Sequence, residues 1–105
     1  MHVLVKEKSW LAKLAALVLK KENMAIVMGN CIHLWNADRH YFLSDKQWLR
    51  HEIVHVQQFR RHGFVWFICL YVYESLLHGY QQNKYETAAR LHENDEDILQ
   101  NITVD

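Results

Sequence analysis

Residues 49–59 read LRHEIVHVQQF, and within this stretch two histidines lie four positions apart, with a glutamate directly after the first. In an α-helix, side chains four residues apart lie on one face, one turn above the other. His51 and His55 are therefore placed to bind a single ion, and Glu52 lies beside them. This is the H-E-x-x-H arrangement, in which two histidines bind zinc and the glutamate acts as general base.

The flanking residues predict that the motif lies on a long helix. Ser44 begins an S-x-x-Q sequence of the capping-box type, and Gly63 is a stop signal about twenty residues later. Leu49 and Ile53 recur at helical spacing, so one side of this helix is expected to be buried. Gln58 falls on the adjoining stripe with the two histidines, where it could hydrogen-bond a ligand or the substrate, although a helix-surface amide is the preferred interpretation.

The rest of the chain predicts a small sheet and further helices. We expect a strand over 3–6, a helix over 10–23 capped by Ser9, a hairpin over 24–35, a third strand over 40–43, a buried core helix over 64–78, a helix over 84–99 capped by Asn83, and a loose tail over 100–105. Together these elements predict one α+β domain over 1–105, in which a small β-sheet or hairpin packs on three to four helices.

Composition limits the classes of partner. Twelve basic residues balance twelve acidic ones, which gives no sign of a nucleic-acid partner. The apolar run over 64–73 is about half the length of a spanning helix, so we expect a core helix rather than membrane contact. No signal peptide is evident, and the two cysteines lie among apolar neighbours. We therefore expect a cytoplasmic protein with buried, reduced thiols.

A third zinc ligand has to come from elsewhere in the chain, because a catalytic zinc takes three protein ligands and leaves one position for water. The extended motif with a histidine six residues after the second one fails, since Arg61 stands there. Glu86 lies in the first turn of a capped helix, where small Ala88 allows close approach to a neighbour. Glu74 ends an apolar run, where an unpaired carboxylate is costly. Both glutamates stay open, with Glu86 preferred.

The sequence HEIVHVQQ, followed by an aromatic-rich helix and then GYQQNKYETAAR, resembles the small gluzincin-like zinc metallopeptidases. It is also similar to uncharacterised bacterial domains with an H-E-x-x-H-V-x-Q-Q signature. The resemblance covers about Leu43 to Arg90 and implies a minimal zincin-like domain with the motif on its central helix. It further implies one Zn²⁺ per chain, held by His51, His55 and Glu86. The second acidic residue that often follows the third ligand is absent here, which implies a weaker site.

The function expected from these features is a zinc metallopeptidase, an endopeptidase that hydrolyses peptide or protein substrates with Glu52 as general base. Tyr80, Tyr85 and His78 are candidates for stabilising the developing oxyanion. So small a domain has little surface for substrate selection, so a larger protein partner is expected to contribute. Two alternatives remain: a catalytically inactive module with structural zinc, and a helical protein-interaction module. An exposed apolar patch over 66–73 would favour the latter.

Overall fold

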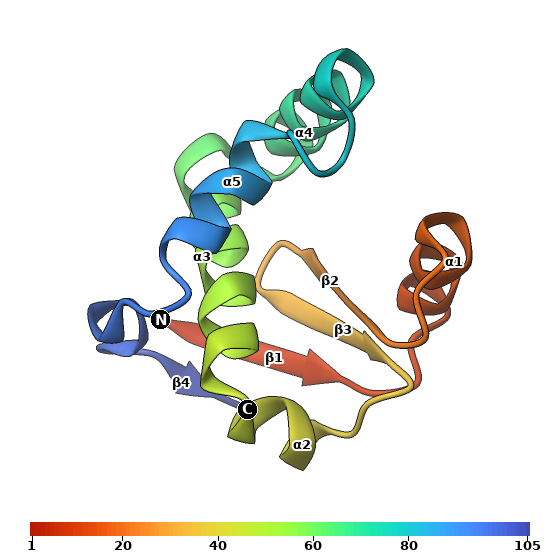
Figure 1. The fold of residues 1–105 in the computed structure, drawn as a ribbon. Coiled ribbons are helices and arrows are strands. Elements are labelled where there is room, and N and C mark those ends of the chain that lie inside the picture. The colour runs from red at the N-terminus through yellow and green to blue at the C-terminus, as the bar shows by residue number, and fades with distance from the viewer.

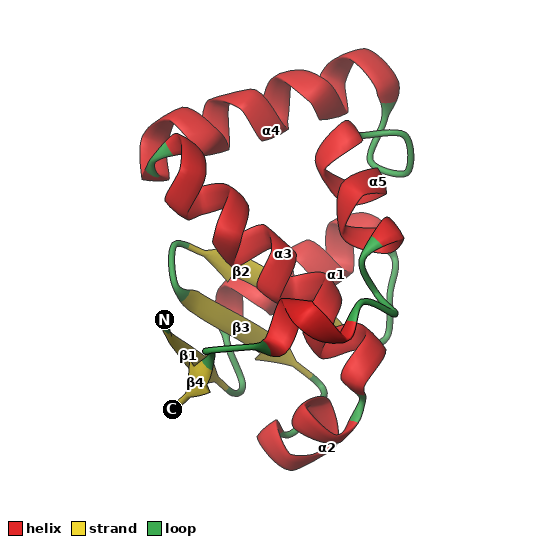
Figure 2. Cartoon of the chain, turned by 90° about the vertical axis from the view of Figure 1, so that its left-hand side faces the viewer, coloured by secondary structure: helices red, strands yellow, loops and turns green.

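The computed structural model describes all 105 residues and shows an α+β domain with five α-helices and a small four-stranded sheet (Figures 1 and 2). The strands lie side by side in the order β2-β3-β1-β4. In chain order the elements are β1 (His2–Lys6), α1 (Trp10–Leu19), β2 (Met24–Met28), β3 (Cys31–Trp35), α2 (Arg39–Ser44), α3 (Lys46–His62), α4 (Phe64–His78), α5 (Lys84–Leu91), the 3₁₀ turn η1 (Glu96–Leu99) and β4 (Thr103–Val104).

The sheet combines a hairpin with two parallel pairings. The predicted hairpin is confirmed: β2 and β3 are antiparallel, and Met28 lies opposite Cys31 across the turn. Gly29 in this turn has φ of 67°, a conformation that favours glycine and suits tight hairpins. β1 runs parallel to both β3 and β4. β2 is consequently an edge strand, and this edge lies next to α3.

The hydrophobic core lies between the sheet and α3. Ile32 and Leu34 of β3 are fully buried with Val3 of β1, and they belong to one cluster with Ile53 and Val56 of α3. Burial of apolar side chains on both elements holds α3 across the sheet. Because the two histidines of the motif lie on an adjoining stripe of the same helix, this packing brings them beside the β2 edge.

Two local predictions between the hairpin and α3 are wrong. Residues 40–43 form part of helix α2 rather than a third strand, because the Asp38 carboxylate accepts a hydrogen bond from a backbone N–H three residues later and starts a helical turn. Ser44 is the last residue of α2 and does not cap the motif helix. Asp45 caps α3 instead, again through a backbone N–H three residues on.

The ends of three elements also differ from the prediction. α1 stops at Leu19 and α5 stops at Leu91, after which a short 3₁₀ turn replaces the predicted helix to residue 99. The last residues are not a loose tail, because β4 pairs with β1. The Arg39 guanidinium adds a hydrogen bond to the backbone oxygen of Val104 at 3.2 Å. The C-terminal segment therefore completes the sheet.

The largest difference concerns α4. The helix forms over the predicted residues, but Phe67 is its only buried side chain, so the prediction of a core helix is wrong. α4 lies at one end of the molecule, above α3 and α5 (Figures 1 and 2).

The two cysteines are less buried than predicted. Cys69 on α4 is exposed and Cys31 is half-buried, so the expectation of two buried thiols is wrong. None of the helices combines the length and apolar character needed to cross a membrane.

Candidate metal centre

Helix α3 carries the three polar side chains of the motif toward β2 and α5. Glu52 and His55 are buried and His51 is half-buried, although all three are polar. The His51 and His55 rings have centroids 5.1 Å apart, as expected for residues one helical turn apart. Burying polar groups is costly unless they find partners, so this concentration indicates a functional cluster.

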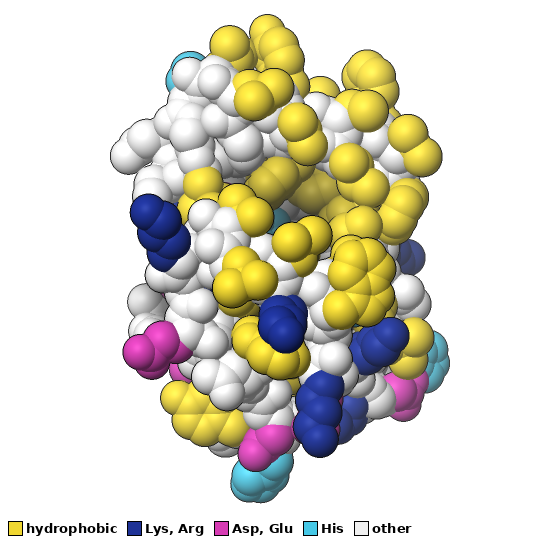
Figure 3. Space-filling view, turned by 90° about the vertical axis from the view of Figure 1, so that its right-hand side faces the viewer, with side chains coloured by type: hydrophobic (Ala, Val, Ile, Leu, Met, Phe, Trp, Pro, Cys, Tyr) yellow, Lys and Arg dark blue, Asp and Glu magenta, His cyan; other side chains and the backbone are white.

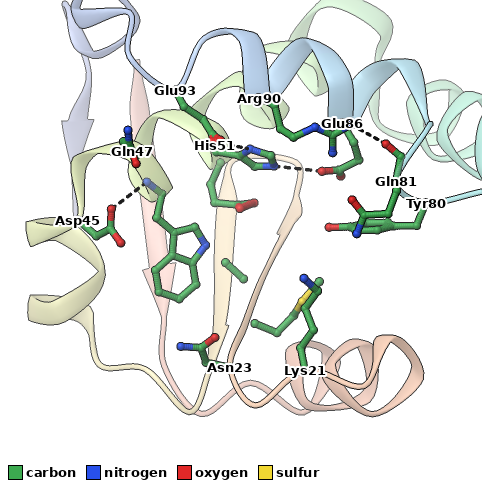
Figure 4. Close-up of a pocket in the computed structure, with 14 residues that line it drawn as sticks. Lys21, Asn23, Asp45, Gln47, His51, Tyr80, Gln81, Glu86, Arg90 and Glu93 are labelled. Atoms are coloured by element: carbon green, nitrogen blue, oxygen red, sulfur yellow. Dashed lines mark hydrogen bonds and ion pairs between the residues drawn. The ribbon is translucent and has the colours of Figure 1, made fainter.

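Glu86 of α5 supplies the partner for both imidazoles. Its Oε1 lies 3.0 Å from Nε2 of His51, and its Oε2 lies 3.0 Å from Nε2 of His55. One potential ligand atom from each of the three residues lies within 4.8 Å of the other two. Figure 4 shows Glu86 reaching from α5 toward His51. Two histidines and a glutamate are a donor set of catalytic zinc sites.

Asn83 fixes the helix that carries Glu86. This fully buried side chain caps α5 by accepting a hydrogen bond from the Tyr85 N–H at 2.8 Å. Its Nδ2 donates to the backbone oxygen of Tyr71 at 3.0 Å and to Oγ of Ser75 at 2.9 Å, both on α4. In turn the Tyr71 hydroxyl donates to Oε2 of Glu86. α4 thereby positions both α5 and the Glu86 carboxylate.

Glu74, the other candidate from the sequence, does not join the cluster. Its carboxylate accepts a hydrogen bond from the Lys84 N–H at 3.2 Å and lies 4.0 Å from His78. A carboxylate at this position is stabilised by the partial positive charge of the α5 N-terminus. Of the two glutamates, the structure brings only Glu86 to the histidines.

Gln58 orients the imidazole of His55. Its Nε2 donates to the backbone oxygen of Tyr85 at 3.1 Å, so its Oε1 faces Nδ1 of His55 at 2.8 Å. Nδ1 therefore carries a hydrogen, and Nε2 is the nitrogen that faces the cluster. This Nε2 is buried and has no hydrogen-bond partner, although it lies 3.0 Å from a carboxylate oxygen of Glu86. A buried imidazole nitrogen that faces a carboxylate at this distance suits a shared cation, either a proton or a metal ion, so these residues fit zinc.

The electrostatics of the cluster also favour positive charge. Burial raises the pKa of Glu86, but the hydrogen bonds from His51 and His55 outweigh it and hold the pKa well below its usual range. Burial lowers the pKa of His55, but the neighbouring carboxylates of Glu86 and Glu52 outweigh it and raise the pKa to about 9. Glu86 is therefore an anion at neutral pH, and its surroundings stabilise a cation beside it.

Glu52 has a different environment from Glu86. Burial raises its pKa to about 7, and the two histidines only partly offset this effect. A carboxyl group with a pKa near neutrality can accept a proton and give it back, which is the property required of a general base. The surroundings therefore give the two carboxyl groups different roles: Glu86 stays ionised at neutral pH, and Glu52 can carry a proton.

A polar pocket of about 400 Å³ opens next to the cluster (Figure 4). Its lining includes His51, Glu52, Glu86 and Tyr80. Burial and the charge of Glu86 raise the pKa of Tyr80, so its hydroxyl stays protonated. Of the three side chains considered from the sequence as oxyanion donors, only Tyr80 lines this pocket. Tyr85 is buried against other aromatic rings and His78 is exposed.

A second pocket, of about 530 Å³, reaches the same residues from the apolar side. It runs between α1, β2, α3 and α4, and most of its lining is hydrophobic. Met24 to Met28 of the edge strand β2 line one wall, and His51, His55 and Glu86 belong to its polar end. The candidate metal centre is therefore reached by a polar and by an apolar route.

Sequence reasoning missed two residues that support the cluster, Tyr71 and Glu93, and read a third, Gln58, as a surface amide. Gln58 lies three residues after His55 on the same helix face, and that spacing is a usable signal. Tyr71 is hidden in an aromatic-rich segment, and no local pattern marks it. Glu93 follows the end of α5, and its Oε2 lies 4.0 Å from Nδ1 of His51, so a further acidic side chain lies near this candidate ligand.

No protein-family model, curated protein or solved structure matches this chain.

Proposed function

We propose that this protein is a zinc-dependent metallopeptidase with a minimal zincin-like domain. The observation that carries the proposal is the convergence of His51, His55 and Glu86 within 4.8 Å, with Glu52 buried beside them. These three residues would hold one Zn²⁺ per chain. When bound, zinc supplies Lewis-acid polarisation of a scissile carbonyl and of a water molecule.

The remaining steps fall to side chains of this chain. Glu52 takes a proton from the attacking water and later returns it to the nitrogen of the leaving amine. Its pKa of about 7 suits both transfers at neutral pH. The Tyr80 hydroxyl, which remains protonated, donates a hydrogen bond where negative charge develops on the carbonyl oxygen.

The apolar pocket supports peptides as the proposed substrate class. The edge strand β2 forms one wall, so an extended peptide can add to the sheet through its backbone. Hydrophobic side chains dominate the remaining walls, which favours substrates with apolar residues near the scissile bond. A peptide or protein substrate is therefore the class that this site would accept.

Cleavage of a peptide library by the zinc-loaded protein, read by mass spectrometry, tests this proposal. Glu52→Gln should retain zinc and lose at least about a hundredfold in cleavage rate, because it removes the proton acceptor but no ligand. If the wild type holds one zinc and cleaves nothing, the peptidase assignment fails. Equal cleavage by Glu52→Gln would assign the activity to a contaminant.

A second candidate function is an interaction module, and the exposed apolar surface of α4 favours it. If the zinc ion of such a module is structural, a fourth protein ligand closes the coordination position that an enzyme leaves open to water. Cobalt substitution separates the two candidates, because a hydroxamate changes the visible spectrum of the cobalt protein only when that position is open. A changed spectrum supports the peptidase, and an unchanged one supports a structural site.

A further inference from the structure

Helix α4 differs from an ordinary surface helix, because most of its exposed side chains are apolar while Tyr71 and Glu74 turn polar groups toward the protein. Tyr71 and Glu74 point toward α5, where they bond Glu86 and the Lys84 N–H. The exposed positions of α4 carry no lysine, arginine, aspartate or glutamate, and Leu76 is 81% exposed. We call this the α4 stripe: Val65, Trp66, Cys69, Val72, Tyr73, Leu76 and Leu77. An exposed apolar patch of this extent is typical of a surface that contacts another protein or a membrane.

Helix α1 presents a second apolar surface beside the α4 stripe. Its outward residues are Trp10, Leu14, Leu17 and Val18, all more than half exposed. Leu14 and Val18 line the same apolar pocket as Val72 of α4, so the two helices form the two sides of one hollow. Figure 3 shows hydrophobic side chains gathered around this hollow. We call this surface the apolar face.

The charges near the apolar face are mainly basic. Lys13, Lys20 and Lys21 are exposed on or directly after α1, and Arg60 and Arg61 are exposed just before α4. Within α1 and α4 the only acidic side chain is Glu74, which is half-buried and engaged at the α5 N-terminus. Two exposed acidic residues, Glu7 and Glu22, flank α1, and the basic residues outnumber them. An acidic run over 93–97 lies beyond α5, away from α4 (Figure 1).

We propose that the apolar face docks onto the surface of an anionic lipid bilayer. Exposed aromatic side chains such as Trp10, Trp66 and Tyr73 prefer the boundary between headgroups and acyl chains. A helix with one exposed apolar face can bury that face at this boundary, and neighbouring lysines and arginines bind anionic headgroups. A symmetric dimer through the same face would bring two basic rims together, which opposes self-association.

Docking would place the mouth of the apolar pocket at the bilayer surface. The pocket leads from α1 and α4 to His51, His55 and Glu86, so the proposed peptidase would meet segments of proteins that lie at the membrane. This consequence rests on the proposed function. The docking itself requires neither zinc nor Glu52, so loss of cleavage and loss of docking are separate results.

Flotation of the full chain with phosphatidylcholine vesicles, with and without phosphatidylglycerol, tests the proposal. The wild type should float with anionic vesicles, and Leu76→Glu should lower its partition coefficient about tenfold, because it places a charge in the buried part of the contact. Leu91→Glu is the matched control: Leu91 is 77% exposed on α5, outside the apolar face. Its partition coefficient should stay within about twofold of the wild-type value. Circular dichroism confirms that each variant is folded.

Charge reversal tests the basic rim. Lys20→Glu and Lys21→Glu should each lower binding to anionic vesicles about fivefold, and should leave any binding to neutral vesicles unchanged. Lys46→Glu, at the start of α3, is the control and should leave both unchanged.

Failure of the wild type to float with either vesicle would overturn the proposal. Equal effects of Leu76→Glu and Leu91→Glu would overturn it as well. So would a wild-type dimer in light scattering that Leu76→Glu converts to a monomer, since a second copy would then cover the face.

Discussion

The side-chain amide of Gln58 determines which nitrogen of His55 faces Glu86. Gln58 accepts a hydrogen bond from Nδ1 of His55 at 2.8 Å while it donates to a backbone oxygen of α5 at 3.1 Å. The imidazole is therefore locked with Nε2 toward the carboxylate, which is the orientation a metal ligand needs. The link also joins α3 to α5, the two helices that contribute the candidate ligands.

Replacing Gln58 by leucine should weaken zinc binding by about 10–100-fold, because the ligand loses the partner that fixes its ring. Competition with a chromophoric chelator measures the affinity. Gln57→Leu is the matched control, since Gln57 is the exposed neighbour on the same helix. Similar affinities for the two variants would mean that Gln58 has no role in orienting His55.

The hydroxyl of Tyr71 should also contribute to zinc affinity. It donates to Oε2 of Glu86 and holds the carboxylate in place. Tyr71→Phe keeps the ring packing and removes this donor, so we expect affinity to fall about tenfold. Tyr73→Phe, on the exposed side of the same helix, should leave affinity unchanged. An unchanged affinity in Tyr71→Phe would show that the carboxylate is held by the histidines alone.

Asn83→Ala should lower the free energy of unfolding by about 2–3 kcal/mol. The change removes a helix cap worth about 1 kcal/mol and two further hydrogen bonds from a fully buried side chain. Urea unfolding followed by circular dichroism measures the loss. Asp38→Ala removes an exposed cap of α2 and should cost only about 1 kcal/mol. Equal losses would argue that Asn83 does not tie α4 to α5.

His33 should make the fold less stable in mild acid. Burial lowers its pKa, and the charge of Lys6 acts in the same direction. The unfolded chain therefore binds a proton at higher pH than the folded chain, so stability falls as the pH drops through the unfolded value of about 6.5. His33→Gln should flatten this decline in urea titrations with chelator present. Exposed His40→Gln is the control, and a decline equally steep in His33→Gln and the wild type would refute the assignment.

Elements with a strong local pattern could be predicted from the sequence. The hairpin at Gly29, the helix through His51 and His55, and the cap at Asn83 follow from turn, periodicity and capping signals that act over a few residues. The preference for Glu86 over Glu74 rests on the resemblance to gluzincin-like metallopeptidases, and less firmly on its position in a capped first turn with small neighbours. In the structure this first turn of α5 lies against α3, and the Glu86 carboxylate meets both histidines.

Features that depend on distant partners could not be predicted. Residues 103–104 are too short to carry a strand signal, and they become β4 only because β1 offers an unpaired edge. Periodicity cannot show which side of an almost wholly apolar helix is covered, so α4 was read as core. The role of Tyr71 depends on the crossing of α4 and α5, which no local pattern encodes.

Zinc content per chain, measured on protein purified without chelator, tests the central claim most directly. The wild type should hold one zinc, Glu86→Gln should lose it, and Glu74→Gln should keep it, because only Glu86 meets both histidines. Circular dichroism verifies that both variants are folded. If the wild type holds no zinc even after the metal is added, or if Glu86→Gln binds zinc as tightly as the wild type, the proposed metal centre is wrong.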